Sequence, residues 1–337
     1  MSPTGTAGQG EPPDPTAAFK ILGNETRLAI LSELLETMER PLSFSELRKR
    51  LGMPDGSQFN YPLRKLEPTY VVQTDGSERT DGSRGSADGR SAGGYSLTMA
   101  GMMVTTAIVA RTLIDQPTIP PFEVDGECVT CGGGLLARYE DEMVSVNCAD
   151  CDQYHLHLFF PPGGLVDRTP EEVAAASDSY FRTWARSFVD GVCLGCAGRV
   201  RRSFLGPGNT LPAAVVGHTI AERLGPTSGP SFFFECEQCF LWYHLVIGKT
   251  LLFEPVVVEF FRDHGLDFYE VPLWTLPWCV AGVAGEYSTV VSESPLRVAV
   301  RIPLEDETLT VTVDEDLEVV DTERTGGGDS EIASARS

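Results

Sequence analysis

Eight of the nine cysteines of this chain occur as four Cys-x-x-Cys pairs, and this spacing limits what the surrounding residues can form. Two thiolates separated by two residues can bind one Zn²⁺ from a tight turn, and two such turns complete a tetrahedral Cys₄ site. We therefore expect two structural zinc ions per chain. The predicted ligands are Cys128, Cys131, Cys148, Cys151, Cys193, Cys196, Cys236 and Cys239.

The four pairs belong to an internal repeat. The segments GECVTCGG (126–133) and GVCLGCAG (191–198) resemble each other, as do CADCDQYHL (148–156) and CEQCFLWYHL (236–245). Sixteen residues separate the first two pairs, which matches a zinc ribbon, and 39 separate the last two, so the second copy carries an insert. Each copy precedes an expected helix, 170–188 or 255–264. Sequential pairing, with one zinc per copy, is the simplest prediction, and exchange of pairs between copies is the alternative.

Four sulfur ligands leave no open position for a bound water, so the sites are expected to be structural and not catalytic. Thiol-based redox sensing and metal-responsive regulation are the alternatives, and disulfides are disfavoured in a reducing cytoplasm. Three histidines that follow the second pairs are alternative ligands, although we favour strand residues packed beside the metal: His155, His157 and His244. Cys279 is expected to be a buried core thiol. We find no catalytic motif and predict that the protein is not an enzyme.

The net charge of −22 comes from 48 acidic residues against 26 basic ones, of which only four are lysine. This acidic, lysine-poor composition is typical of salt-adapted archaeal proteins, whose carboxylate surfaces keep them hydrated. The chain opens without an apolar signal segment, and the apolar stretch 99–114 is too short to span a bilayer. We expect a cytoplasmic protein that has no membrane contact.

The charge is unevenly distributed. Residues 1–115 carry 14 acidic and 12 basic side chains, whereas residues 116–337 carry 34 and 14, a balance of −20. The stretch between residues 40 and 65 contains six basic residues and only two acidic ones, so a local basic surface is expected on an acidic protein. Nucleic-acid phosphates are contacted by such cations, so a nucleic-acid site is expected in the N-terminal part.

The N-terminal part follows an order of elements that is typical of winged helices. Residues 15–22 and 24–37 are expected to be helices, with Asn24 as the N-cap of the second. Ser43 or Ser45 caps a third, 46–51, and a fourth runs over 57–67. Strands 70–73 and 95–97 then enclose a long loop, 74–94, and a last helix begins at Thr98 and runs to about residue 115. Arg79, Arg84 and Arg90 in the loop could contact phosphates, or the loop could remain solvated.

Four segments carry a family resemblance: AFKILGNETRLAILSELL, SFSELRKRLGM, DGSQFNYPLRKLE and GGYSLTMAG. They resemble the ArsR-type winged helix-turn-helix regulators, particularly the haloarchaeal ones with a following cysteine-bearing region, over residues 16–115. The resemblance implies a fourth helix in the DNA major groove, a wing on the backbone or minor groove, and a homodimer formed through the helix 98–115. The metal-sensing members have cysteine in the third helix, where this chain has ELRKR (46–50), so metal sensing there is not implied.

In the fourth helix the apolar residues Phe59, Leu63 and Leu66 are expected to face inward. The outward polar residues are therefore the predicted DNA contacts: Ser57, Gln58, Asn60, Tyr61, Arg64 and Lys65. Pro62 removes a backbone donor inside this helix, which predicts a kink or a late helix start near Ser57.

Together these patterns predict an α+β multidomain protein. Its expected parts are a disordered start (1–14), a winged helix-turn-helix domain (15–115), a duplicated zinc-ribbon-like region with helices (122–190 and 191–270), a small antiparallel β-sheet region (271–323) and a disordered tail (324–337). The predicted function is sequence-specific binding of double-stranded DNA in transcription regulation, with an acidic C-terminal region that binds a ligand or a protein partner. The alternatives are a zinc-ribbon interaction adaptor that does not bind DNA, and a thiol or metal sensor.

Overall fold

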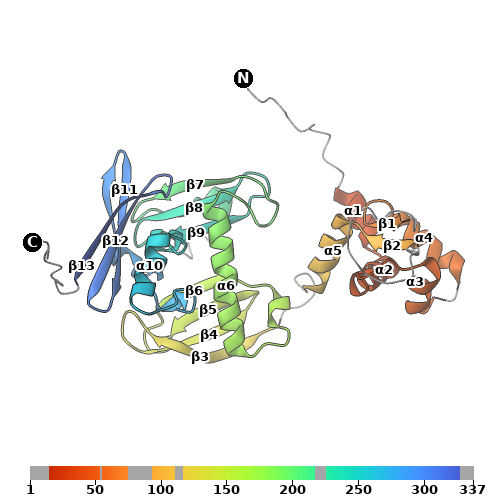
Figure 1. Ribbon diagram of the computed structural model, residues 1–337, viewed down its shortest axis with the longest axis horizontal. Coiled ribbons are helices and arrows are strands. Elements are labelled where there is room, and N and C mark those ends of the chain that lie inside the picture. The colour runs from red at the N-terminus through yellow and green to blue at the C-terminus, as the bar shows by residue number, and fades with distance from the viewer. Residues whose placement is uncertain (1–14, 54, 75–92, 111–116, 217–224, 327–337) are drawn as a thin grey trace, which may run out of the picture. The chain divides into compact units, whose positions relative to one another are not determined.

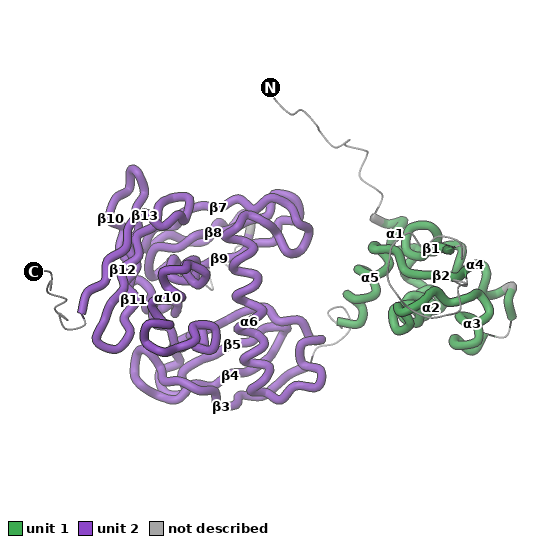
Figure 2. Tube along the Cα trace, viewed as in Figure 1, with its two compact units in different colours: residues 1–115 green, residues 116–337 purple. Residues whose placement is uncertain are grey.

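The computed structural model describes residues 15–53, 55–74, 93–110, 117–216 and 225–326. It has an α+β architecture in which every sheet is antiparallel (Figure 1). The chain divides into two compact units, residues 1–115 and 116–337 (Figure 2). The predicted loop at 74–94 lies mostly outside the described residues, as do its three arginines and both chain ends.

The first unit is a cluster of helices with one β-hairpin. Its elements in chain order are α1 (Pro15–Leu22), α2 (Glu25–Glu36), α3 (Phe44–Arg50), α4 (Gly56–Leu66), β1 (Val71–Thr74), β2 (Gly94–Leu97) and α5 (Met99–Val109). Helices α2, α3 and α5 each follow a residue whose side chain accepts a hydrogen bond from a free amide of the first turn. Asn24 accepts from Arg27, Ser43 and Glu46 form a capping box, and Thr98 accepts from Gly101.

The core of this unit comes from the apolar faces of α2, α3 and α4 and from the hairpin. Phe59, Leu63 and Leu66 of α4 are buried, as their spacing predicted. Helix α5 packs closely on the hairpin because Gly101 has no side chain: a Cβ there would lie 2.0 Å from the Tyr70 carbonyl oxygen. Helix α4 begins at Gly56, one residue before the expected start at Ser57, and continues through Pro62.

The described residues of the second unit form three sheets and helix α6 (Pro170–Val189). The first sheet, in the order β3-β4-β5-β6, comprises β3 (Ile119–Glu127), β4 (Gly134–Glu140), β5 (Met143–Cys148) and β6 (Tyr154–Phe159). The second, in the order β7-β8-β9, comprises β7 (Val200–Leu205), β8 (Ser231–Cys236) and β9 (Trp242–Val246). In Figure 1, α6 runs from the first sheet to the second.

The two sheets have corresponding parts, as the internal repeat predicts. Strands β4, β5 and β6 correspond to β7, β8 and β9, and the place of β3 is taken in the second copy by a single bridge between Val192 and Arg199. The longer spacing of the second copy is an insert between β7 and β8, which includes the short helix α7 (Ala213–Val216). Each copy is followed by a helix near the expected place, α6 and α10 (Pro255–Asp263).

The remaining elements complete this unit. They are the short helices η1 (Pro162–Leu165), α9 (Ile247–Thr250), η2 (Leu273–Thr275), η3 (Pro277–Cys279) and η4 (Ala284–Glu286), and the meander β10 (Ser288–Glu293), β11 (Leu296–Leu304), β12 (Glu307–Asp314) and β13 (Val319–Gly326). Strand β13 extends to Gly326, beyond residue 323 where the sequence placed the start of the tail. It does so because its backbone pairs with β12 and Arg324 forms an ion pair with Asp263.

One apolar core joins both copies and the C-terminal sheet. It contains residues such as Phe234, Phe260, Trp278 and Val311, so the three segments that the sequence separates pack as one unit. Cys279 is fully buried in this core, and Trp274 is also buried there. None of the helices in the described part of the chain has the length and apolar run needed to cross a bilayer.

Candidate metal centres

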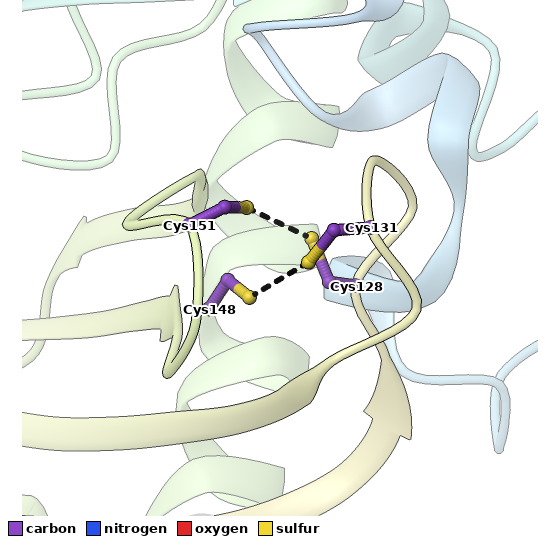
Figure 3. Close-up of side chains that lie close together, drawn as sticks. All are labelled: Cys128, Cys131, Cys148 and Cys151. Carbon is purple, nitrogen blue, oxygen red and sulfur yellow. Dashed lines mark hydrogen bonds between the residues drawn. The ribbon is translucent and has the colours of Figure 1, made fainter.

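The first cysteine cluster forms where two tight turns face each other. Cys128 and Cys131 follow β3, Cys148 is the last residue of β5, and Cys151 lies in the turn between β5 and β6 (Figure 3). The sulfur of Cys128 lies 3.7 Å from that of Cys151, and the sulfur of Cys131 lies 3.4 Å from that of Cys148. All four sulfur atoms lie within 4.8 Å of one another, so the cluster could hold one metal ion.

The backbone of each turn explains why the thiols converge. In the first turn, the amide of Cys128 donates to the Gly133 carbonyl, and the amide of Gly132, at a φ of 74°, donates back to Cys128. In the second, the amide of Cys148 donates to the Gln153 carbonyl, and Asp152 adopts a φ of 57°. Left-handed residues at these points let the chain reverse within a few residues.

The second cluster repeats this geometry. The sulfur–sulfur distances are 3.7 Å for Cys193 and Cys239 and 3.5 Å for Cys196 and Cys236. The corresponding amides donate from Cys193 to Gly198 and from Cys236 to Leu241. The structure therefore brings the cysteines together in sequential order, one cluster per copy of the repeat.

The clusters have the donor set and spacing of a structural zinc site. Four sulfur ligands at about 2.3 Å from a tetrahedral zinc lie about 3.8 Å apart, close to the observed 3.4–3.7 Å. In each cluster two cysteines are buried and two are exposed. Each centre therefore joins the core on one side, while its outer sulfurs face solvent.

The thiol pKa differs among the cysteines of a cluster. Burial, the largest influence, raises the pKa of Cys128, but a hydrogen bond with His155 and the amides of Thr130 and Cys131 outweigh it and lower the pKa to about 5. The amide of Cys239 contributes most to lowering the pKa of Cys236 to about 7. Since thiolate is the form that binds metal, each cluster has one buried cysteine that ionises first.

The histidines occupy different environments. His155 is buried, with Nδ1 2.7 Å from the Trp274 carbonyl oxygen and Nε2 3.3 Å from the Cys128 sulfur. Its counterpart His244 has a buried Nε2 without a hydrogen-bond partner among the described residues, and burial lowers its pKa to about 4. The side-chain groups in the described part of the chain that could hold a metal ion consist of cysteines alone.

The predicted DNA contacts lie on α4. Gln58, Asn60, Tyr61, Arg64 and Lys65 are exposed, opposite the buried apolar stripe. Ser57 lies in the first turn of the helix, and its side chain is outside the described set. The Lys65 ammonium lies 5.6 Å from the centre of the Tyr61 ring.

The basic stretch between residues 40 and 65 carries less free charge than its composition suggests. Arg40 forms an ion pair with Glu46, and Arg50 forms one with Glu33. Arg64 has no hydrogen bond or ion pair to another described residue, and its exposure leaves the guanidinium open to solvent. The C-terminal half of α4 therefore carries positive charge that is not neutralised by another described residue.

The fold and the two clusters define an α+β protein with two candidate Cys₄ metal centres in its second unit. The family model described as a domain of unknown function, DUF7351, matches residues 125–319, more than half of the chain, and the chain belongs to this family. A second domain of unknown function, DUF7347, matches residues 15–108. Neither the curated proteins nor the solved structures that were compared contained a match.

Proposed function

We propose that this protein is a DNA-binding transcriptional regulator whose first unit is a winged helix-turn-helix. The observation that carries the proposal is the exposed face of α4. Gln58, Asn60, Tyr61, Arg64 and Lys65 gather there, while Phe59, Leu63 and Leu66 anchor the opposite face. The order α3, α4, hairpin and α5 is the order of elements in a winged helix.

The side chains of this face fit the two kinds of contact that DNA recognition needs. Asparagine and glutamine pair with adenine in the major groove, and arginine pairs with guanine. Lys65 and Tyr61 are suited to contact phosphates, which position the helix without specifying sequence. Near the end of helix α3, Lys49 adds positive charge next to the backbone of bound DNA, whereas Arg50 is paired with Glu33.

The proposed regulator is a homodimer formed through α5. This helix exposes the apolar side chains Met99, Met103 and Val109, and α1 exposes Phe19. Large apolar side chains that stay exposed along one helix are typical of an interface. Two copies of α4 would then read two half-sites.

We assign one structural zinc to each cysteine cluster. Support comes from the all-sulfur donor set, the sulfur spacing and the fusion of both clusters with the core. In this proposal the second unit is the effector or interaction region, and zinc holds its shape.

Selection of binding sites from a randomised duplex pool tests the DNA-binding proposal. We expect the full-length protein to enrich a sequence motif, and Asn60→Ala or Arg64→Ala to weaken binding to it by about 1–3 kcal/mol, or about five- to 150-fold. Arg199→Ala removes an exposed arginine of the second unit and serves as the matched control. Lack of an enriched motif, or equal binding by the α4 variants and the control, would refute the proposal.

A second candidate is an adaptor whose winged helix binds protein. The balance of −20 on residues 116–337, which repels nucleic acid, favours it. A stoichiometric protein complex without DNA affinity would identify this function.

A further inference from the structure

A pocket of about 400 Å³ opens between β3, α6 and the segment that follows α10. Its volume falls in the range of small-molecule sites. The lining includes Glu123 and Asp125 from β3, Glu171 from α6, and Tyr269, Glu270 and Trp274 from the C-terminal side. No cluster cysteine lines the pocket, but its Trp274 is linked to Cys128 of the first cluster through His155.

The pocket carries uncompensated negative charge. Among the described residues, its lining contains no lysine or arginine. The carboxylates of Glu123, Asp125 and Glu270 form no hydrogen bond or ion pair with other described residues. A fifth acidic residue, Asp178, is neutralised within the fold, because it pairs with Arg182 at 2.8 Å and accepts from the Leu273 amide at 3.0 Å. A cation is therefore the ligand that this electrostatic environment favours.

The spacing of the carboxylates argues against a bare metal ion as that cation. Among the described residues, only the two cysteine clusters bring three or more ligating groups within reach of one ion. The acidic groups of the pocket do not converge in this way. The pocket therefore suits a larger cation, whose charge lies at the end of an organic body or spreads over several atoms.

Aromatic side chains give the pocket a preset shape. Trp274, only 4% exposed, is fixed at both ends: its Nε1 donates to the Asp125 carbonyl at 2.8 Å, and its own carbonyl accepts from His155. His155 in turn contacts the Cys128 sulfur, so the first cysteine cluster holds this wall in place. Tyr269 lines the pocket and is 57% exposed, so its ring is accessible to an entering cation.

We propose that this pocket binds an organic cation with an ammonium or guanidinium group. The inference deepens the proposed effector role of the second unit by naming the chemical class of its ligand. Binding to the pocket does not require DNA, so it is measured separately from the DNA-binding proposal. The cation could be a free amine or an arginine side chain of a protein partner, since both present the same group.

Calorimetric titration of the zinc-loaded full-length protein tests the proposal with two probes. Agmatine supplies a guanidinium and an ammonium without a carboxylate, and the blocked peptide Gly-Arg-Gly supplies an arginine side chain. The titration uses the lowest salt at which the far-ultraviolet spectrum stays constant, because added salt screens such contacts. We expect saturable binding at one site per chain. Agmatine alone indicates a free amine, and binding of the peptide indicates a partner's arginine.

Two variants locate the binding. Glu270→Gln keeps the shape of an exposed side chain and removes one charge, and Tyr269→Ala removes the exposed ring. We expect each to weaken binding by about threefold to tenfold. Glu293→Gln on β10 removes the same charge from an exposed position of the same unit and is the control. The proposal is overturned if neither probe binds, or if the pocket variants bind as tightly as the control.

Discussion

Replacement of Cys131 or Cys196 by serine removes one sulfur from one cluster and leaves the other cluster complete. Both residues are exposed, so the substitution does not introduce a hydroxyl into the apolar core. We expect the purified wild-type protein to contain two zinc ions, each single variant to contain one, and the double variant to contain none. Cys279→Ala is the matched control, because this cysteine belongs to neither cluster.

The loss in free energy of unfolding that follows removal of one zinc can be estimated from the structure. The sulfur pairs already stand 3.4–3.7 Å apart, so metal binding needs little rearrangement of the folded turns. The apparent binding free energy of a structural zinc is about 10–16 kcal/mol. A whole domain is stable by about 5–15 kcal/mol, so loss of one metal removes most of the stability of the surrounding fold. The control loses only about 1–2 kcal/mol from its small cavity.

Metal analysis and thermal unfolding together test this reasoning. The buried cysteines of both clusters belong to one core, so loss of either metal is expected to lower the unfolding temperature of the second unit as a whole. Chelation of the wild type should have the same effect and leave the helices of the first unit folded. Retention of two zinc ions by C131S or C196S, or unchanged unfolding after chelation, would refute the structural role.

Three further predictions concern single residues. The pKa of Glu46 is lowered to about 2, mainly by its hydrogen bond with Arg40. Glu46→Gln should therefore lower the urea midpoint of the first unit above pH 4.5, and the difference from the wild type should vanish as the pH falls toward 2. A difference that persists at pH 2 would contradict this. The pKa of His244 is lowered to about 4 in the fold, so the folded protein keeps this imidazole neutral at pH values where the unfolded chain protonates it. The free energy of unfolding is therefore unaffected above pH 6.5 and falls as the pH drops from 6.5 to 4. His244→Phe should remove up to roughly 3 kcal/mol of that pH dependence in denaturant titrations, and an unchanged profile would count against the burial of this imidazole. Gly101→Ala should destabilise the first unit by about 1–3 kcal/mol in thermal unfolding, because the new Cβ meets the Tyr70 carbonyl; an unchanged midpoint would show that α5 can move away.

The local features that the sequence predicts best are those with a fixed chemical spacing. The Cys-x-x-Cys pairs predicted the two candidate metal clusters, because two residues between thiols suit one turn around one ion. Asn24 could be identified as a cap because its side-chain oxygen stands before an apolar helical repeat, and Ser43, the observed cap of α3, was one of two candidates with Ser45. The buried stripe of α4 followed from the spacing of Phe59, Leu63 and Leu66.

Features that depend on distant contacts could not be predicted in this way. Strand β13 is almost wholly exposed and polar, so its sequence lacks the apolar alternation of a strand, and pairing with β12 makes it one. Arg40 and Arg50 count as free charges in the sequence, although Glu46 and Glu33 neutralise them. The acidic pocket joins Asp125 to Trp274, which are far apart along the chain, and so left no local signal.

The two copies of the repeat place different residue types at equivalent left-handed backbone positions, and one of these positions gives a last prediction. Asp152 and Phe240 each follow the last cysteine of their cluster and adopt φ values of 57° and 59°. Aspartate tolerates this left-handed region, but a bulky aromatic residue does so at a cost of about 1 kcal/mol or more. The Phe240 side chain is 68% exposed, so burial offsets little of that cost.

Phe240→Asn should therefore stabilise the second unit by about 1 kcal/mol, measured as a higher midpoint in denaturant at unchanged zinc content. Asp152→Asn is the matched control and should change the midpoint little, because both residue types accept this conformation. A lower midpoint for Phe240→Asn would show that the ring packs on the fold more than its exposure indicates. A higher one would mean that the second copy keeps an exposed aromatic ring at the expense of stability, as expected of a side chain that serves an interaction.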